Sequence, residues 1–119
     1  MRFPWLIAAL LFAALLSLLQ HWALADFLYW RYVWFDVPMH YLGGVALGSF
    51  LIALSPQFRP RVYLLGIIIL IIGWEVFEYI FGLPREHNYV LDTSIDLLMG
   101  TLGALTTYII ARRTLWRSV

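Results

Sequence analysis

The sequence contains no cysteine and no lysine, and only 13% of its 119 residues are charged. Without cysteine, a disulfide framework and a thiolate metal site are both excluded. Soluble domains carry about 25% charged residues, so this low charge and a hydrophobic content of 63% point to a membrane protein. The formal net charge is only +1, and we expect no nucleic-acid partner.

Four long apolar stretches make up most of the chain, and they cover residues 4–25, 37–55, 62–82 and 92–111. A helix of about 20 residues crosses the hydrocarbon core of a bilayer, and each stretch has about that length. The connections are short, so sequential helices should be antiparallel neighbours. The sequence therefore predicts an all-α protein, a bundle of four transmembrane helices with short loops that forms a single domain over residues 1–119.

The first apolar stretch has two interpretations. Arg2, the apolar run and the small residues Ala23 and Ala25 also resemble a secretory signal that is cleaved after Ala25. The run is longer than the core of such signals, which spans about 7–15 residues, and this favours a retained helix. Intact-mass measurement distinguishes the two.

Six of the eight arginines fall on one side of the predicted bundle, the side that also holds both termini. They are Arg2, Arg59, Arg61, Arg112, Arg113 and Arg117. Because short cytoplasmic loops retain positive charge, both termini are predicted to be cytoplasmic. The connection at residues 26–35 then lies outside. Six of its ten residues are aromatic, and we interpret it as an anchor at headgroup depth, with a substrate lid as the alternative.

With this topology every acidic residue belongs to the outer half of the protein, and one histidine lies among them. The candidate metal ligands are Asp36, His40, Glu75, Glu78, Asp92 and Asp96. At a rise of about 1.5 Å per residue, all six lie within about 10 Å of the outer helix ends. The spacings within each stretch are three or four residues, which places each pair on one helix face. We expect these faces to meet in one buried pocket.

Small residues continue the same helix faces. Gly44 and Gly48 follow the face of Asp36 and His40, and Gly100 and Ala104 follow the face of the last two aspartates. Small residues allow membrane helices to approach closely. This pattern supports a pocket that points into the bundle.

Several carboxylates in one apolar pocket cannot all stay ionised without a counter-charge. They must share protons, pair with Arg31 or Arg85, or hold a cation. Carboxylates with an imidazole suit a divalent ion such as Mg²⁺, Mn²⁺, Zn²⁺ or Fe²⁺, and spacing does not choose among these. For Asp36 and Asp92, helix capping is an equal alternative, because both begin predicted helices. We place His21, Glu86 and His87 outside the site, at the interface or in solvent.

Three blocks of sequence resemble a known family. They are Asp36-Val-Pro-Met-His40 followed by Gly43-Gly44, Trp74-Glu75-Val-Phe-Glu78-Tyr79, and Asp92-Thr-Ser-Ile-Asp96-Leu-Leu98. Together they resemble the YjdF-like bacterial inner-membrane proteins, which are similar in layout to the VanZ-like proteins. The resemblance spans residues 36–103 and implies a bacterial plasma-membrane location and one functional set of acidic residues and histidine. The family is uncharacterised, so it implies no reaction.

Three functional hypotheses remain open from the sequence. The first is a pocket that binds a divalent cation or a polar headgroup. The second is a metal-dependent hydrolase of a lipid-linked or amphiphilic substrate, with Glu75 or Glu78 as general base. The third is a structural subunit of a membrane complex. An oligomer is compatible with each.

Overall fold

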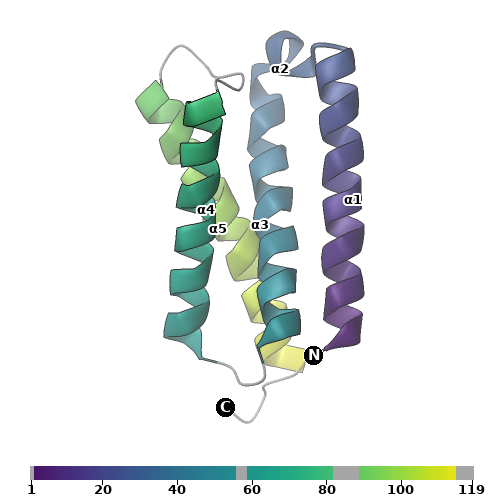
Figure 1. Cartoon of the computed structure of the whole chain (residues 1–119), viewed down its shortest axis with the longest axis vertical. Helices are drawn as coiled ribbons and strands as arrows, with labels where there is room; N and C mark the ends of the chain where they lie inside the picture. Colours follow the sequence, from purple (N-terminus) through teal and green to yellow (C-terminus); the bar gives the residue numbers. More distant parts are fainter. Residues whose placement is uncertain (1, 56–58, 82–88, 115–119) are drawn as a thin grey trace.

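The computed structural model describes residues 2–55, 59–81 and 89–114, which are entirely helical apart from turns (Figure 1). The elements are α1 (Phe3–Ala25), α2 (Leu28–Arg31), the 3-10 helix η1 (Val33–Phe35), α3 (Asp36–Leu54), α4 (Pro60–Phe81) and α5 (Tyr89–Thr114). Four helical segments are long and apolar enough to cross a membrane: 3–25, 33–54, 60–81 and 90–114. The predicted fold class, a multi-pass bundle of four long helices, is confirmed.

Helix boundaries differ from the predicted ones by at most three residues among the described positions. α1 begins beside Pro4, whose fixed φ suits the first turn of a helix. α5 is longer than the predicted stretch at both ends, because residues 89–91 precede Asp92 in the helix and the polar residues Arg112, Arg113 and Thr114 continue it. The predicted end of the third stretch at Gly82 lies outside the described residues.

The connection between α1 and α3 is more ordered than an ordinary loop. Phe27 adopts the left-handed conformation (φ 56°), which reverses the chain after α1. α2 and η1 follow at once, and the rings of Tyr29 and Phe35 pack edge to face with their centroids 5.3 Å apart. The aromatic residues thus form a folded cover at this end of the bundle. Their depth in a membrane stays a prediction.

α3 lies at the centre of the bundle, with α1 on one side, α4 on the other and α5 behind it (Figure 1). α1 and α3 are neighbours, as predicted for sequential helices, but the most extensive packing joins α3 to α5. Glycine is the reason. A Cβ atom at Gly44 would collide with the carbonyl oxygen of Gly100, and one at Gly103 would collide with that of Tyr41. The two helix backbones therefore touch.

Hydrogen bonds between helices reinforce the lower part of the bundle. The hydroxyl of Tyr41 in α3 bonds to that of Thr106 in α5 at 2.7 Å. Tyr63 of α4 donates to the carbonyl oxygen of Ala104 at 2.8 Å. Arg2 joins the start of α1 to the end of α3, since its backbone N–H donates to Ala53 and its guanidinium donates to the carbonyl of Ser55. The opposite end of the bundle holds the acidic side chains.

Candidate metal site

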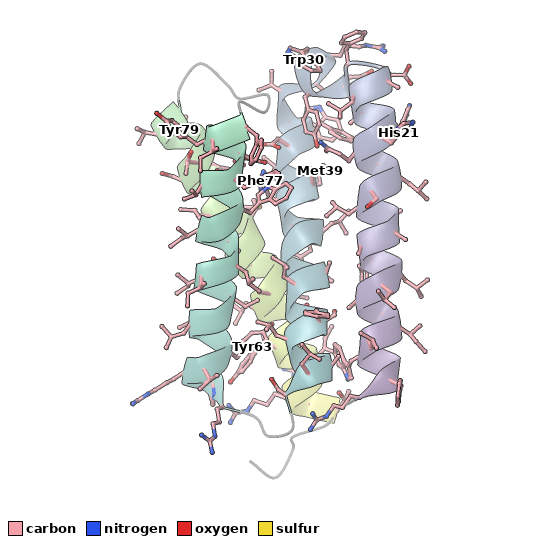
Figure 2. All side chains as sticks on the ribbon, in the orientation of Figure 1. His21, Trp30, Met39, Tyr63, Phe77 and Tyr79 are labelled. Atoms are coloured by element: carbon pink, nitrogen blue, oxygen red, sulfur yellow. The ribbon has the colours of Figure 1, made fainter. Side chains whose placement is uncertain are left out.

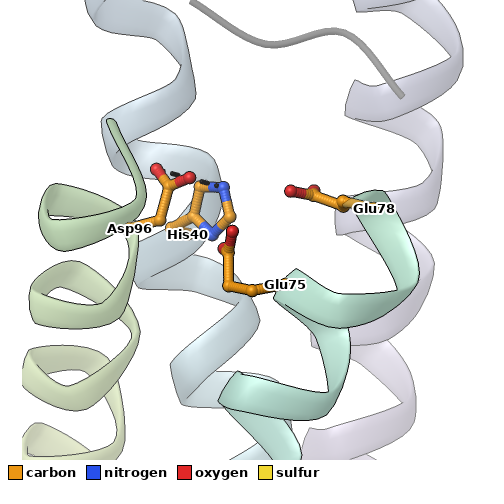
Figure 3. A group of neighbouring side chains, drawn as sticks. All are labelled: His40, Glu75, Glu78 and Asp96. Atoms are coloured by element: carbon orange, nitrogen blue, oxygen red, sulfur yellow. Dashed lines mark ion pairs between the residues drawn. The ribbon is translucent and has the colours of Figure 1, made fainter. Parts of the chain in front are cut away.

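Three helices bring four potential metal ligands to one point. His40 comes from α3, Glu75 and Glu78 from successive turns of α4, and Asp96 from α5 (Figure 3). Each can offer one ligand atom, and these atoms all lie within 4.8 Å of one another. An ion between them would be within reach of an imidazole nitrogen and three carboxylate oxygens. The group could therefore hold a metal ion.

The imidazole of His40 is held between two aspartates. Its Nε2 atom lies 3.3 Å from Oδ1 of Asp36, one turn earlier in α3, and 3.3 Å from Oδ1 of Asp96 in α5. The helical spacing of four residues positions the first partner, and the close contact of α3 with α5 positions the second. The packing of two helices thus fixes the ring in the site.

Two carboxylate oxygens in the site are buried without a hydrogen-bond partner among the described residues: Oε1 of Glu75 and Oδ1 of Asp96. The residues themselves are 8% and 2% exposed. Oδ1 of Asp96 is near Nε2 of His40, but the contact does not have hydrogen-bond geometry. An unsatisfied buried polar group costs about 1–3 kcal/mol, and more if it is charged. Such atoms require a proton or a ligand.

Glu78 is oriented by a tryptophan that the sequence did not identify as part of the site. The indole N–H of Trp74, one turn earlier in α4, donates to Oε1 of Glu78 at 2.7 Å. The ring of Trp74 in turn stacks on Phe77, with centroids 5.3 Å apart. A carboxylate can accept this bond and still coordinate an ion, because it carries about four lone-pair sites. The aromatic pair therefore positions a potential ligand.

All six predicted ligands gather at this end of the bundle, in two overlapping groups. The second group consists of Asp36, Asp92 and Asp96, whose nearest oxygens also lie within 4.8 Å of one another. Asp96 belongs to both groups and is the most deeply buried acid of the described residues. The predicted convergence of the six side chains is therefore observed, and their role as ligands stays a prediction.

The two outer aspartates lie in the first turns of their helices, and neither is the residue that precedes its helix. The residue that precedes α3 is Phe35, which is itself helical, so Asp36 lies inside a continuous helical segment and makes no capping bond. Asp92 comes three residues after the start of α5. The capping alternative is thus wrong for Asp36. Both carboxylates do lie in first turns, where the helix dipole favours negative charge.

The remaining sequence candidates lie elsewhere. His21 is exposed and points away from the bundle (Figure 2). Arg31 lies over the ring of Tyr32, 5.6 Å from its centroid, and forms no ion pair with a described acidic side chain. The salt bridge from Arg31 that we considered is therefore not formed. Arg85, Glu86 and His87 lie outside the described residues.

The site opens into a pocket of about 850 Å³ between α1, α3 and α4. Sequence reasoning did not identify two polar residues on its wall, Gln20 of α1 and Tyr29 of α2. The hydroxyl of Tyr29 donates to the side-chain oxygen of Gln20. Burial, together with the carboxylates of Asp36, Glu78 and Asp96, raises the pKa of Tyr29, so its hydroxyl stays a donor at neutral pH. Gln20 could have been noticed as a polar residue within an apolar stretch, whereas nothing distinguished Tyr29 from its aromatic neighbours.

No family model matches the chain, and neither the curated proteins nor the solved structures contain a significant match to it. The resemblance to the YjdF-like proteins therefore stays a prediction. What the residues establish directly is a four-helix membrane protein with a buried acidic and histidine group that could hold a metal ion.

Proposed function

We propose that this protein binds a divalent metal ion through His40, Glu75, Glu78 and Asp96. One observation carries the proposal: ligand atoms from three helices converge within 4.8 Å, and two of the carboxylate oxygens are buried without a hydrogen-bond partner among the described residues. A bound cation accounts for both the convergence of the ligand atoms and the two unsatisfied oxygens. It offsets the charge of the carboxylates and accepts their lone pairs.

The charge around the pocket favours a cation over other ligands. Among the described residues, the pocket wall carries four carboxylates, those of Asp36, Glu75, Glu78 and Asp96, and neither arginine nor lysine. In an apolar environment this density of negative charge requires protons or a bound positive ion. His40 can supply only one positive charge. A divalent ion offsets twice as much charge.

The ligand types indicate which ions fit best. One imidazole with several carboxylates is a donor set that suits Mn²⁺, Fe²⁺ or Zn²⁺, whereas Mg²⁺ favours oxygen and water. Metal-binding histidines commonly donate their second ring N–H to a carboxylate, and Asp36 lies at the right position for this role. We assign Asp36 the task of orienting His40 in the site.

We further propose that the protein lies in a bacterial plasma membrane with both termini cytoplasmic and the metal site toward the outer face. The basic residues support this orientation. Arg2, Arg59, Arg61, Arg112 and Arg113 all lie at or beside helix ends that are opposite the acidic site, and short cytoplasmic loops retain such charge.

Metal analysis of detergent-purified protein tests the metal proposal. The wild type is compared by inductively coupled plasma mass spectrometry with Glu75→Gln and Asp96→Asn, after reloading with Mg²⁺, Mn²⁺, Fe²⁺ or Zn²⁺. Asp26→Asn is the matched control, because Asp26 is exposed at the same end of the bundle and its carboxylate accepts a hydrogen bond from the indole of Trp22. We expect stoichiometric metal in the wild type and control, and none in the two site variants. Wild-type protein that binds none of the four ions would overturn the proposal in favour of protonated carboxylates.

One observation favours a second function, metal-dependent hydrolysis of an amphiphile. The pocket volume of about 850 Å³ is far larger than an ion needs and adjoins Glu75 and Glu78. In such an enzyme, an ion held by His40, Glu75, Glu78 and Asp96 would supply Lewis acidity. A glutamate of the site would accept a proton from the attacking water, whose oxygen would bond to the acyl or phosphoryl centre as the bond to the leaving oxygen breaks, and the proton would then pass to that leaving oxygen. Incubation with bacterial lipids, followed by mass spectrometry, tests it. Products must form with metal and must be lost in Glu78→Gln.

A further inference from the structure

The pocket continues away from the metal site as an apolar groove. Its floor is α3 and its two sides are α1 and α4, which both pack on α3 but scarcely contact each other. From His40 to Leu47 the floor descends about 10 Å toward the middle of the bundle. Below the polar end the wall is almost wholly apolar, with Ala13, Leu16, Ile69 and Leu70 facing it. The groove is thus polar at the end near the metal site and apolar along the rest of its length.

Two glycines keep the groove wide. Gly43 lies on the floor, and a Cβ atom there would meet only a side-chain carbon of Leu16, at 3.9 Å. Gly73 lies on the α4 side, and a Cβ atom there would meet nothing within 4 Å. Neither glycine is needed for close contact between helices, in contrast to Gly44 and Gly103. Larger side chains at Gly43 and Gly73 would occupy the groove and leave the bundle intact.

The dimensions and the polarity fit an amphiphile. Ligand pockets in proteins typically enclose about 300–1,000 Å³ and combine apolar walls with a few polar groups, as this one does. Burial of an acyl chain gives no hydrophobic gain over the surrounding bilayer, because lipid tails are equally apolar. Selective binding must therefore come from the polar end. There, four carboxylates face one histidine and, on the proposed function, one divalent ion, so a negatively charged headgroup is repelled.

We propose that the groove binds one chain of an uncharged lipid that carries ester or hydroxyl oxygens, of the diacylglycerol class. The chain lies between α1 and α4, and the oxygens of the head reach the ion held by His40, Glu75, Glu78 and Asp96. The hydroxyl of Tyr29 and the amide of Gln20 line the same end and supply further polar contacts for the head. The contact with the ion rests on the proposed function, whereas the chain site rests on the groove itself.

Photo-crosslinking in lipid nanodiscs tests this proposal. The probe is a diacylglycerol with a diazirine in one acyl chain, incorporated at low density in phosphatidylcholine, and labelled peptides are identified by mass spectrometry. In the wild type loaded with Mn²⁺, we expect more labelling on the groove wall, at Leu16, Leu47 and Leu70, than on the outer surface of α1. A phosphatidic acid probe with the same chain should label this wall about tenfold less.

The glycines supply the matched variants. Gly43→Leu and Gly73→Leu fill the groove without changing a metal ligand, and we expect each to lower labelling of the wall about tenfold while Mn²⁺ binding is retained. Ala14→Leu adds the same type of bulk on the exposed side of α1, away from the groove, and should change neither quantity.

The outcomes separate the two proposals. Even labelling of groove and outer surface, unchanged by Gly43→Leu, would identify ordinary surrounding lipid and overturn the groove. Selective labelling without Mn²⁺ binding would overturn the metal proposal and keep the chain site. Equal labelling by both probes would reject the uncharged headgroup. Mn²⁺ binding without selective labelling would leave a metal site that takes no lipid.

Discussion

Glu75 gives the most direct test of metal binding in the site. Its carboxylate is buried, and one of its oxygens has no hydrogen-bond partner in the described residues. We predict that Mn²⁺, at a concentration 100 times its dissociation constant, raises the free energy of unfolding of the wild type by about 2.7 kcal/mol and so raises its melting temperature. Glu75→Gln keeps the shape of the side chain but loses the charge, so Mn²⁺ should leave its melting temperature unchanged. Thermal unfolding in detergent, followed by circular dichroism, measures both. Equal shifts in wild type and variant would place the ion elsewhere.

Tyr29 gives the site a pH dependence at high pH. Its pKa is raised above the ordinary value of 10.0 by burial and by nearby carboxylates, so the folded protein holds this proton more tightly than the unfolded chain. The stability that results is fully present below about pH 10 and is lost as the pH rises through the folded pKa. We predict that the wild type loses stability between about pH 9 and about pH 11, and that Tyr29→Phe loses less. Urea unfolding at both pH values tests this, and an identical loss in the two proteins would contradict it.

Tyr29→Phe also removes the hydrogen bond to Gln20. At neutral pH we therefore expect this variant to be less stable than the wild type by about 0.5–1.5 kcal/mol. Tyr32→Phe, at an exposed ring in the same connection, is the control.

At the residue scale, the sequence predicted which acids and which histidine converge but not how they are held. The helical spacings of Asp36, His40 and Asp96 were sufficient for their depth and face. Trp74 and Glu78 also share a helix face by their spacing of four residues, but spacing does not reveal that the indole N–H turns toward the carboxylate. The contact of Tyr29 with Gln20 depends on how the chain folds after α1, which spacing does not reveal either. The alternative of capping at Asp36 fails because η1 runs into α3 without a break.

At the element scale, the site depends most directly on the close packing of α3 against α5. Gly44→Leu would force a side chain into the backbone of α5 at Gly100, where nothing can move aside cheaply. We expect a loss of about 3 kcal/mol or more in the free energy of unfolding, together with loss of metal binding. Gly73→Leu places the same side chain in open space and should cost less than about 0.5 kcal/mol. Unfolding in mixed micelles compares them, and equal losses would refute the backbone contact.

At the element scale, the sequence predicted all four long helices, because apolar length alone identifies a membrane span. It also predicted the small residues on the packed faces. The sequence did not predict that the second and fourth spans, α3 and α5, would pack more closely than spans that follow one another in the chain. Short loops limit which helices can be neighbours, but they do not determine which neighbours pack most closely. The decisive signal was Gly103, which lies seven residues after Asp96 and therefore on the same helix face, but was not included in the predicted set.

The whole molecule carries its acidic site and most of its basic residues at opposite ends. We predict that reporters fused to either terminus are cytoplasmic and that a reporter inserted within residues 26–35 is outside the membrane. Fusions to a phosphatase that is active only outside, and to a fluorescent protein that folds only inside, measure this. The reverse pattern would place the metal site toward the cytoplasm and overturn the proposed orientation.

The close contact of α3 with α5 also bears on how the protein is made. The ribosome makes α4 after α3 and before α5. The two helices whose backbones touch, α3 and α5, are therefore not synthesised one directly after the other. Until α5 is made, the carboxylates of α4 have no Asp96 beside them, and α3 has no surface on which Gly44 can pack. The site is complete only when α5 has entered the membrane. A chain that stalls or is truncated before α5 therefore lacks both Asp96 and the surface on which Gly44 packs, so its acidic residues lie in an incomplete site.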